Sequence, residues 1–457
     1  MRSRLTVALG RAARAAARLR GGGSGGTAFP GLVMEKTDPG FLARTLDRLP
    51  HGVVLVSGTN GKTTTTKMVV QLLRDQGLKV FTNRTGSNFV RGVLAALLTE
   101  VDAAGRLDAD VAVLELDEAH AVHFVRSVRP RAALMLNVMR DQLDRFGEID
   151  YTASLLRKAA LATRDVVVVN ADDPRLNGER FLSGLSARTA AFGVGPALRS
   201  VFLSDDDLRA GQSSGPDAAA ASDGAQAPAP QASACPTPRV RLVALDGPTA
   251  TVEVDGAEHE VTFSIPGIHN VLNACAALTL VLEILGEGAD LPRLLATLAQ
   301  IRPAFGRGEV ITLDGRPVQL ALVKNPAGFR MSLMSAPTAQ APAADRDRPD
   351  ELVMIAINDE YADGRDMSWL WDVDFSSLRD VGVAVVTGVR AWDMALRLRY
   401  DEVPIGAVEP DLEAALDALR ERAAAEDRPM RIYTSYTAML ALRARLGHLT
   451  EVEEVMK

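Results

Sequence analysis

A short glycine-rich segment with a lysine and several hydroxyl side chains carries the clearest chemistry in the sequence. Residues 57–66 read Ser-Gly-Thr-Asn-Gly-Lys-Thr-Thr-Thr-Thr and follow the apolar run Val53–Val56. We expect a buried strand, a tight loop and a helix start, in that order. In such a loop backbone N–H groups bind phosphate oxygens, Lys62 adds positive charge, and the Thr63 hydroxyl can bind Mg²⁺. The segment therefore predicts a nucleotide site.

The spacing of this loop is shorter than in the usual P-loop. The first glycine of Gly-x-x-x-x-Gly-Lys-Thr would fall at Val56, whereas the sequence has Gly58 and Gly61. An ordinary glycine turn before a helix is the alternative interpretation. We disfavour it because strand, loop, lysine, hydroxyl and helix follow one another in the order that phosphate binding needs.

The composition is that of a globular protein with more than one domain. The chain has 457 residues, 47% of them hydrophobic, which is enough for two or three domains. The formal net charge is -7 and the sequence pI is about 5.6. An acidic balance argues against a nucleic-acid binder that depends on neutralising phosphates.

Cysteine usage and hydropathy both indicate a cytoplasmic protein. Cys235 and Cys275 are the two cysteines, too few for a disulfide framework or a four-thiolate zinc site. No apolar run approaches the length of a membrane span. Arg11, Arg14 and Arg18 interrupt any apolar signal core near the amino terminus, so we do not expect a secretory peptide.

Short apolar runs alternate with helix-patterned stretches, which predicts an α/β fold with a mostly parallel sheet. We expect strands near 52–57, 78–82, 111–116, 132–137 and 165–170. We expect helices near 62–76, 89–100, 119–127, 151–163 and 270–285. Alternating polar and apolar residues between 239 and 265 indicate a small antiparallel meander.

A second α/β cycle begins near residue 318, so we expect two domains joined near 305–318. Its strands are expected near 318–323, 352–357, 381–386 and 431–433. Residues 207–238 are rich in Ala, Pro, Ser and Gly and are expected to be a low-complexity insertion, with a shorter example at 336–350.

More chemistry stands at the ends of the first-domain strands, where open α/β sheets bind ligands. Glu115 ends one apolar run and offers the oxygen ligand that a hard cation prefers; a solvated strand-end acid is the alternative, which we disfavour because the phosphate loop is present. Asn170-Ala171-Asp172-Asp173 closes another run. His269 and Asn270 open a helix, where contact with a nucleotide base and helix capping are equally good interpretations.

These pieces together resemble the Mur ligase family, ATP-dependent enzymes that join an amine to a carboxylate through an acyl phosphate. The resemblance implies a central P-loop ATPase domain with a parallel sheet and a meander at 50–312, after a segment at 1–49. It implies a smaller Rossmann-like α/β domain at 313–457. ATP and Mg²⁺ are the implied cofactors.

The resemblance also implies roles for individual residues. Glu115 and Thr63 would hold Mg²⁺, with Lys62 and Glu115 acting in catalysis. The implied nucleotide-binding residues are Gly58, Thr59, Asn60, Gly61, Lys62, Thr63, Thr64, Asn170, Asp173, His269, Asn270, Asn273 and Arg307. Arg307 stands where the family carries an arginine that senses the γ-phosphate.

This sequence differs from the peptide-adding members of the family, and the differences indicate which branch of the family it resembles. Those enzymes carry an extra amino-terminal domain of roughly a hundred residues, about one domain in size, whereas here only residues 1–49 precede the first strand region. The segments 85–88, 141–148 and 363–372 instead resemble the branch that amidates lipid II. That likeness implies conversion of D-glutamate to D-isoglutamine in the stem peptide, with ammonia from a separate GatD-type glutaminase subunit.

In that branch an aspartate of the second domain completes the partner's Cys-His site by orienting the histidine. The candidates are Asp366 and Asp372, with Asp363 third. Trp369 and Trp371 lie between them and are equally suited to anchoring the interface and to core packing.

Two further expectations concern ligands. Many family members hold a four-cysteine zinc ribbon where this chain has the single Cys235, so we predict no zinc site. The arginine-rich amino-terminal stretch could contact anionic lipid near a lipid-linked substrate, but a solvated helix is the plainer interpretation.

Two other classes of function stay open at this point. One is a self-sufficient ligase of the folylpolyglutamate or peptide-adding kind, which joins an amino acid rather than ammonia. The other is a nucleotide-binding partner that has no catalysis of its own. The sequence predicts no nucleic-acid partner.

Overall fold

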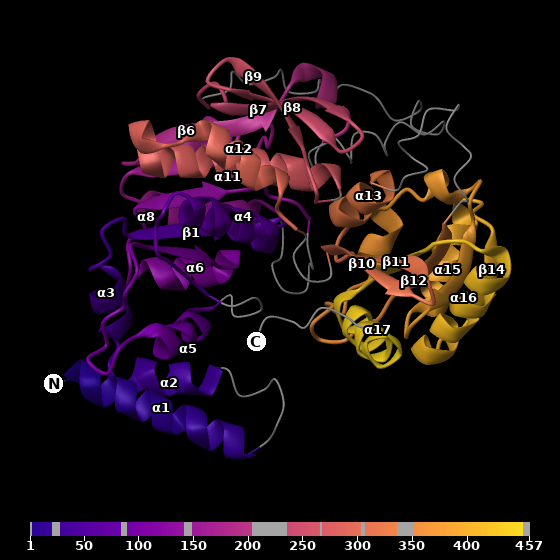
Figure 1. Ribbon diagram of the computed structural model, residues 1–457, viewed down its shortest axis with the longest axis horizontal. Coiled ribbons are helices and arrows are strands. Elements are labelled where there is room, and N and C mark those ends of the chain that lie inside the picture. The colour runs from indigo at the N-terminus through magenta and orange to yellow at the C-terminus, as the bar shows by residue number, and fades with distance from the viewer. Residues whose placement is uncertain are drawn as a thin grey trace, which may run out of the picture. The chain divides into compact units, whose positions relative to one another are not determined.

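The computed structural model describes residues 2–20, 28–83, 89–140, 149–202, 235–265, 267–302, 307–335 and 351–450. The side chains of 18–20, 28 and 307–309 lie outside this description. The chain divides into two compact units, and the stretch from Arg302 to the carboxyl terminus belongs to the second unit, whereas the expected boundary was residue 313. The reason is that the strand after Arg302 pairs within the second sheet. Figure 1 labels the elements of both units.

A mixed sheet forms the framework of the first unit. Among the described residues it has nine strands in the order β2-β3-β1-β4-β5-β6-β7-β8-β9. Neighbouring strands from β2 to β7 are parallel, and β7, β8 and β9 are antiparallel. Their bounds are Val53–Ser57 (β1), Val80–Thr82 (β2), Val111–Glu115 (β3), Ala132–Met135 (β4), Val166–Asn170 (β5), Arg188–Val194 (β6), Val240–Asp246 (β7), Thr249–Val254 (β8) and Ala257–Thr262 (β9).

Helices connect these strands, as parallel pairing requires. They are α1 (Arg2–Arg20), α2 (Ala28–Thr37), α3 (Phe41–Leu46), α4 (Lys62–Asp75), α5 (Val90–Glu100), α6 (Glu118–Val125), α8 (Ile149–Ala162), α9 (Glu179–Leu182), α11 (Ile268–Leu285) and α12 (Leu291–Ala299). Short 3-10 turns occur at Pro196–Leu198 (η2) and Gly286–Gly288 (η4).

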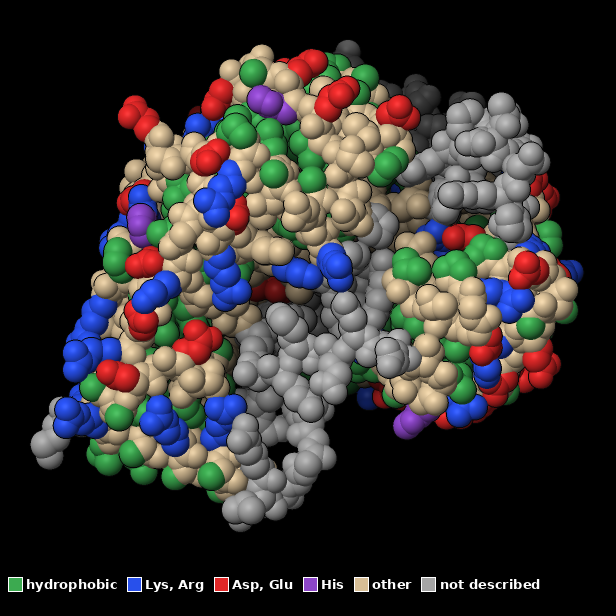
Figure 2. Space-filling model, in the orientation of Figure 1, with side chains coloured by type: hydrophobic (Ala, Val, Ile, Leu, Met, Phe, Trp, Pro, Cys, Tyr) green, Lys and Arg blue, Asp and Glu red, His purple; other side chains and the backbone are tan. Residues whose placement is uncertain are grey.

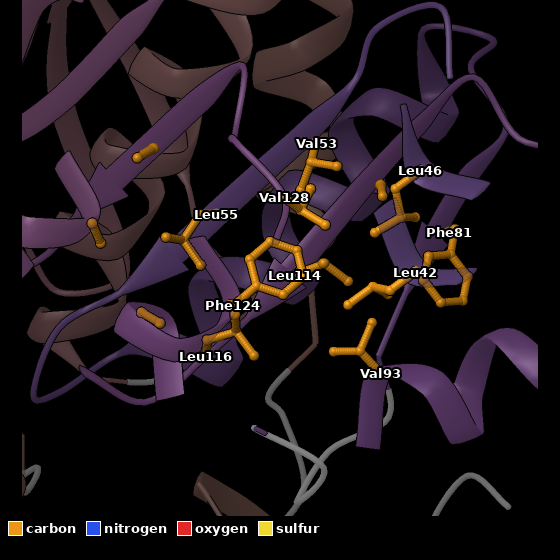
Figure 3. Close-up of a cluster of buried hydrophobic side chains, with 14 of the residues drawn as sticks. Leu42, Leu46, Val53, Leu55, Phe81, Val93, Leu114, Leu116, Phe124 and Val128 are labelled. Atoms are coloured by element: carbon orange, nitrogen blue, oxygen red, sulfur yellow. The ribbon is translucent and has the colours of Figure 1, made fainter. Parts of the chain in front are cut away.

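The core of the first unit fixes the position of the strands. β1 and β3 are buried along their whole length, as expected for a parallel sheet covered on both faces. Alternate residues point to opposite faces, so Leu55 and Leu114 share one face of the sheet. There they join a cluster with Phe124 of α6, drawn in Figure 3 together with Phe81 and Val93. This packing holds the carboxyl ends of β1 and β3 in place.

The second unit has its own sheet. The six described strands run β10-β11-β15-β12-β13-β14, with an antiparallel β10–β11 hairpin and parallel pairs elsewhere. The strands are Arg307–Leu313 (β10), Arg316–Leu322 (β11), Leu352–Ala356 (β12), Val383–Thr387 (β13), Ile405–Val408 (β14) and Met430–Thr434 (β15). The helices are α13 (Pro326–Met334), α15 (Ala391–Tyr400), α16 (Leu412–Glu426) and α17 (Tyr436–Leu449), with 3-10 turns at Ser368–Asp372 (η5) and Ser376–Leu378 (η6).

The predicted α/β fold, with a parallel sheet, a meander and a second α/β sheet, is confirmed. Three of the described strands were not expected. β6 joins the parallel strands to the meander, β10 forms the hairpin that opens the second sheet, and β14 pairs with β13 at its other edge. Most of the insertion 207–238 and all of 336–350 lie outside the described residues.

The expectation that no stretch is apolar enough for a membrane span was wrong for one helix. Among the described residues, Ile268–Gly288 is long and apolar enough to pass such a test. Yet 72% of its most apolar window is buried inside the protein, as in a core helix.

Candidate nucleotide-binding site

The predicted phosphate loop lies where the strand order of the first sheet reverses. β1 pairs with β3 on one side and with β4 on the other. The chain reaches β2 and β3 on the first side before it returns to β4 on the second side. In open α/β sheets ligands bind at the carboxyl ends of the strands beside such a point. Residues 58–61 follow β1 there and lead directly into α4.

The loop is bound to the residues that follow β4. The backbone N–H of Thr59 donates to the Asn137 carbonyl over 3.0 Å, and that of Asn60 donates to Asn137 Oδ1 over 2.8 Å. Asn137 Nδ2 returns a bond to the Asn60 carbonyl over 3.1 Å. The Thr59 hydroxyl accepts from the Met139 N–H over 3.1 Å. These bonds fix the loop backbone.

Both loop glycines are required by geometry. Gly58 has φ +134° and Gly61 has φ +85°, conformations that residues with a side chain rarely adopt. A Cβ on Gly58 would lie 3.0 Å from the backbone of Asn137. A Cβ on Gly61 would lie 2.5 Å from Oδ1 of Asn273, a residue of α11. Asn273, which was predicted to bind the nucleotide from a later helix, is therefore packed against the amino terminus of α4.

Lys62 is a buried cation inside the loop. Its Nζ donates to the Gly58 carbonyl over 2.6 Å and lies 3.4 Å from the Thr59 carbonyl. Two acids at the start of α6 balance its charge, with Asp117 Oδ1 at 3.2 Å and Glu118 Oε2 at 3.7 Å. Sequence reasoning missed these two acids, although they directly follow the Glu115 segment.

Thr63 and Glu115 form a pair of oxygen donors beside the loop. The Thr63 hydroxyl donates to Glu115 Oε1 over 2.8 Å, and Glu115 is buried at the end of β3. Asn83 holds Glu115 by accepting from its backbone N–H over 2.9 Å and donating to its carbonyl over 2.8 Å. Sequence reasoning missed Asn83, which could have been found as the residue directly after β2.

The two expected residues after β5 serve the backbone around them. Asp173 Oδ2 accepts from the Val138 N–H over 2.6 Å, and its Oδ1 accepts from the Arg175 N–H over 2.9 Å. Asn170 Oδ1 accepts from the Asp172 N–H over 3.0 Å. Asp173 therefore ties the end of β5 to the segment after β4, which is the same segment that holds the phosphate loop.

The other predicted nucleotide-binding residues lie at the starts of three elements, α11, α4 and β10. His269 and Asn270 lie in the first turn of α11, and Asn270 is buried one turn before Asn273. Thr64 is buried in the first turn of α4. Arg307 is the first residue of β10, and its side chain lies outside the described residues.

The three candidate aspartates of the second unit differ in their surroundings. Asp363 is buried and accepts from the Thr437 N–H over 2.8 Å and from the Glu360 N–H over 3.1 Å, so it orders its own loop. Asp372 pairs with Arg140, which groups with this unit, over 2.6 Å.

Asp366 is partly exposed, as Asp372 is, whereas Asp363 is buried. Asp366 Oδ1 accepts from the Ser368 N–H over 2.9 Å. Hydrogen bonds from Ser368, together with the charge of Arg140, hold the pKa of Asp366 below its usual value. This carboxylate is therefore ionised at neutral pH.

The two tryptophans separate into one core residue and one surface residue. Trp369 is buried in a cluster with Phe329 and Phe375. Trp371 is 46% exposed and stacks edge-on against Tyr400 with ring centroids 5.1 Å apart.

Both cysteines have a raised pKa. Burial raises the pKa of Cys275 to about 12, and burial together with the nearby Asp172 charge raises that of Cys235 to about 11. Both therefore stay protonated at neutral pH, and the thiolate is the reactive form.

Two family models match the chain. The Mur ligase middle domain matches residues 56–281, and the MurT ligase C-terminal domain matches residues 322–439. The chain belongs to the Mur ligase family.

Within the family, the chain is similar over almost its whole length to the MurT subunit of lipid II isoglutaminyl synthase (glutamine-hydrolysing). The Streptococcus pneumoniae protein is 28% identical over 453 residues, 94% of each chain. The Staphylococcus aureus protein is 27% identical over 432 residues, covering 91% of this chain and 92% of that one. The resemblance stated from the sequence is confirmed.

The fold comparison agrees with this assignment. The crystal structure of MurF ligase from Thermotoga maritima in complex with ADP matches with a TM-score of 0.63. The two chains are 17% identical, and the match covers 91% of this chain and 84% of that one. The Mur ligase fold is confirmed.

The overlap at Gly61 generates a stability prediction. We expect Gly61→Ala and Gly77→Ala each to lose about 1 kcal/mol of unfolding free energy from backbone strain, since both glycines have positive φ. A Cβ on Gly77 meets nothing within 4 Å, whereas one on Gly61 overlaps Asn273. Gly61→Ala should therefore cost about 1–3 kcal/mol more, as overpacking does. Urea unfolding measures both variants, and equal losses would show that the loop does not pack on α11.

Proposed function

We propose that this chain is the ATP-dependent ligase subunit that amidates lipid II for peptidoglycan synthesis. It converts the α-carboxylate of D-glutamate in the stem peptide to the amide of D-isoglutamine. A GatD-type glutaminase subunit supplies the ammonia. The observation that carries the proposal is the set of buried Lys62, half-buried Thr63 and buried Glu115 at the switch point of a Mur ligase sheet. Similarity to MurT over the whole chain supports the choice of substrate and partner.

The reaction needs activation because a carboxylate is a poor electrophile. Transfer of the terminal phosphoryl of ATP to the D-glutamate carboxylate gives an acyl phosphate, and ammonia displaces phosphate from its carbonyl carbon. Lys62 and the N–H groups at the start of α4 stabilise the negative charge on the transferred group. Both remain in place because the loop is tied to Asn137.

Thr63 and Glu115 fit a magnesium site. A hydroxyl and a carboxylate within hydrogen-bond distance offer the oxygen ligands that a hard cation prefers. When bound with the nucleotide, Mg²⁺ offsets charge on the phosphate oxygens. Asn83 fixes the backbone of Glu115, so its carboxylate points to the loop in a defined way.

The remaining nucleotide contacts belong to the elements around the loop. We assign the adenine side of the nucleotide to Asn170 and Asp173. We assign the nucleotide contacts of α11 to His269, Asn270 and Asn273. The packing of Asn273 against Gly61 supports that part of the assignment. Arg307 is assigned to the γ-phosphate.

Ammonia comes from a partner subunit. Glutamine hydrolysis by a thiol needs a thiolate, and both cysteines of this chain have a raised pKa. Within the second unit, Asp366 is the aspartate best suited to orient a partner's histidine. It is ionised, it lies nearer to solvent than Asp363, and it does not pair directly with Arg140 as Asp372 does.

The surface beside this segment fits a protein partner. α15 carries a stripe of large apolar side chains, Trp392, Leu396 and Tyr400, which are 68%, 52% and 70% exposed, and Val389 just before the helix is 63% exposed. Its opposite face is buried, so the helix is apolar on both sides, as in a helix covered from outside. Tyr400 contacts Trp371 of η5, which joins the stripe to the Asp366–Asp372 segment. We assign this surface to the glutaminase subunit of a heterodimer.

A lipid-linked acceptor defines where the reaction takes place. Lipid II is held in the bilayer, and ATP and glutamine are cytoplasmic. We therefore place this subunit in the cytoplasm, at the inner face of the cell membrane.

Reconstitution tests the function directly. The chain is mixed with a matching glutaminase, ATP, Mg²⁺, glutamine and lipid II, and the product is read by mass spectrometry. We expect one hydroxyl of the stem peptide to be replaced by an amine. ATP turnover that depends on an added amino acid would instead indicate a self-sufficient ligase. ATP binding without amidation would indicate a non-catalytic partner.

Thr63 generates a prediction about Mg²⁺. Thr63→Val keeps the shape of the side chain but removes the hydroxyl, and we expect amidation to fall about tenfold to hundredfold, as for loss of a metal-site contact. Higher Mg²⁺ concentration should restore part of the rate.

Thr66→Val is the matched control in the same helix. The Thr66 hydroxyl is buried and has no hydrogen-bond partner within the described part of the chain, so this variant should keep full activity. A Thr63→Val enzyme with an unchanged magnesium dependence would exclude Thr63 from the metal site.

Asp366 generates a prediction that separates the two half-reactions. In the heterodimer, Asp366→Asn should lower glutamine-dependent amidation on the order of a thousandfold, as loss of an orienting carboxylate does. Amidation with added ammonium chloride should continue, because acyl phosphate formation does not use Asp366. Asp372→Asn is measured in parallel. If it alone separates glutamine from ammonium, Asp372 holds the role instead.

The exposed stripe generates a prediction about assembly. Leu396→Gln and Trp392→Ser should each weaken binding to the glutaminase by roughly thirtyfold, the size of an interface hot spot. Leu440→Gln is the control, since Leu440 is an exposed leucine on another helix of the same unit. Affinity is measured by titration calorimetry. Equal affinities for all three variants would place the partner elsewhere.

A further inference from the structure

The outward face of α1 is apolar, although the helix is rich in arginine. Thr6, Val7 and Ala13 are buried against the first unit. Leu5, Ala8, Leu9, Ala12, Ala15 and Ala16 are exposed. These positions follow one another at spacings of three and four residues, so they form one continuous strip along the helix. We call this strip the outward face of α1.

Arginines border the outward face. At 3.6 residues per turn, Arg4 and Arg11 fall along one edge of the strip and Arg2 along the other. All three are exposed, and Arg11 also donates to the Val101 carbonyl over 3.0 Å. Residues 2–20 contain six arginines and no acidic residue. An apolar strip with cationic borders is the pattern of a helix that lies in a membrane interface.

The acids near α1 pair with arginines of α1 and of other elements. Asp38 is buried and binds Arg44 over 2.5 Å and Arg2 over 3.4 Å. Glu35 of α2 binds Arg91 over 2.7 Å. Figure 2 shows blue and green side chains along the edge formed by α1, at the lower left. Arg2 therefore shares Asp38 with Arg44, and the charge of α1 itself is strongly positive, because residues 2–20 hold six arginines and no acid.

We propose that the outward face of α1 docks the protein onto an anionic phospholipid bilayer. The reason why the protein would bind a membrane rests on the proposed function, in which the acceptor is lipid-linked. The leucines enter the interface between headgroups and acyl chains, and Arg4 and Arg11 bind phosphate groups of anionic lipids. The buried face stays packed on the domain, so docking needs no unfolding.

A second copy of the chain fits this face less well. Two copies related by a two-fold axis would bring the same arginine borders together, and like charges repel. The strip is also narrow, with two leucines among alanines, which is little apolar area for a stable dimer. The surface of an anionic bilayer attracts the arginine borders and can take up a narrow apolar strip.

Vesicle binding tests the proposal with the full chain. Vesicles of equal parts phosphatidylglycerol and phosphatidylcholine should bind the protein in co-sedimentation, whereas phosphatidylcholine alone should not. Arg4→Glu with Arg11→Glu should weaken binding by roughly thirtyfold, from the loss of two arginines at an anionic surface. Leu5→Gln with Leu9→Gln removes the apolar anchors at positions that are 61% and 38% exposed and should also weaken binding.

Arg126→Glu with Arg180→Glu is the charge-matched control. Both residues are exposed in the same unit but outside α1, so this variant should bind vesicles as the unmodified protein does. Circular dichroism checks that each variant is folded. The proposal would be overturned if the α1 variants bound vesicles as tightly as the unmodified protein, or if the control variant lost as much binding as they do. It would also be overturned if the α1 variants lost a dimer but still bound vesicles. The assay contains no nucleotide, glutamine or lipid II, so its failure is independent of amidation.

Discussion

The anchoring of one loop to the end of a neighbouring strand is the constraint on which the candidate site depends. Asn137 binds the backbone of Thr59 and Asn60 with its own backbone and side chain. A glycine-rich loop that had to order itself when a nucleotide binds would lose binding free energy to conformational entropy. Here the sheet supplies that order beforehand. The strand order β3-β1-β4 is therefore as much a part of the site as the lysine.

The two units divide the chemistry between them. The first unit holds the cation, the hydroxyl and the carboxylate that suit phosphoryl transfer. The second unit has a different kind of surface, with an ionised aspartate near solvent and an apolar helix stripe. Because both thiols are kept protonated, the chain does not generate ammonia itself in this scheme. Activation of the acid and release of the amine then occur on separate polypeptides.

Site residues that lie in one continuous segment of the sequence could be predicted. Site residues that meet only through the order of the strands could not. The phosphate loop follows one apolar run and Glu115 ends another, so their places at the carboxyl ends of β1 and β3 were predictable. Asn83 and Asn137 are distant from the loop in sequence and meet its surroundings only through the order of the strands. Trp369 and Trp371 were equal candidates for burial, and only the packing of η5 separates them.

The contacts of Lys62 have a consequence for how the loop behaves over a catalytic cycle. The ammonium group donates to the Gly58 carbonyl and faces two carboxylates. In the proposed function, a bound phosphate exchanges one set of oxygens around Lys62 for another instead of creating a new desolvated charge. Such an exchange costs little solvation free energy in either direction. The solvation free energy of Lys62 then changes little both when the substrate binds and when the product leaves, which suits an enzyme that must turn over.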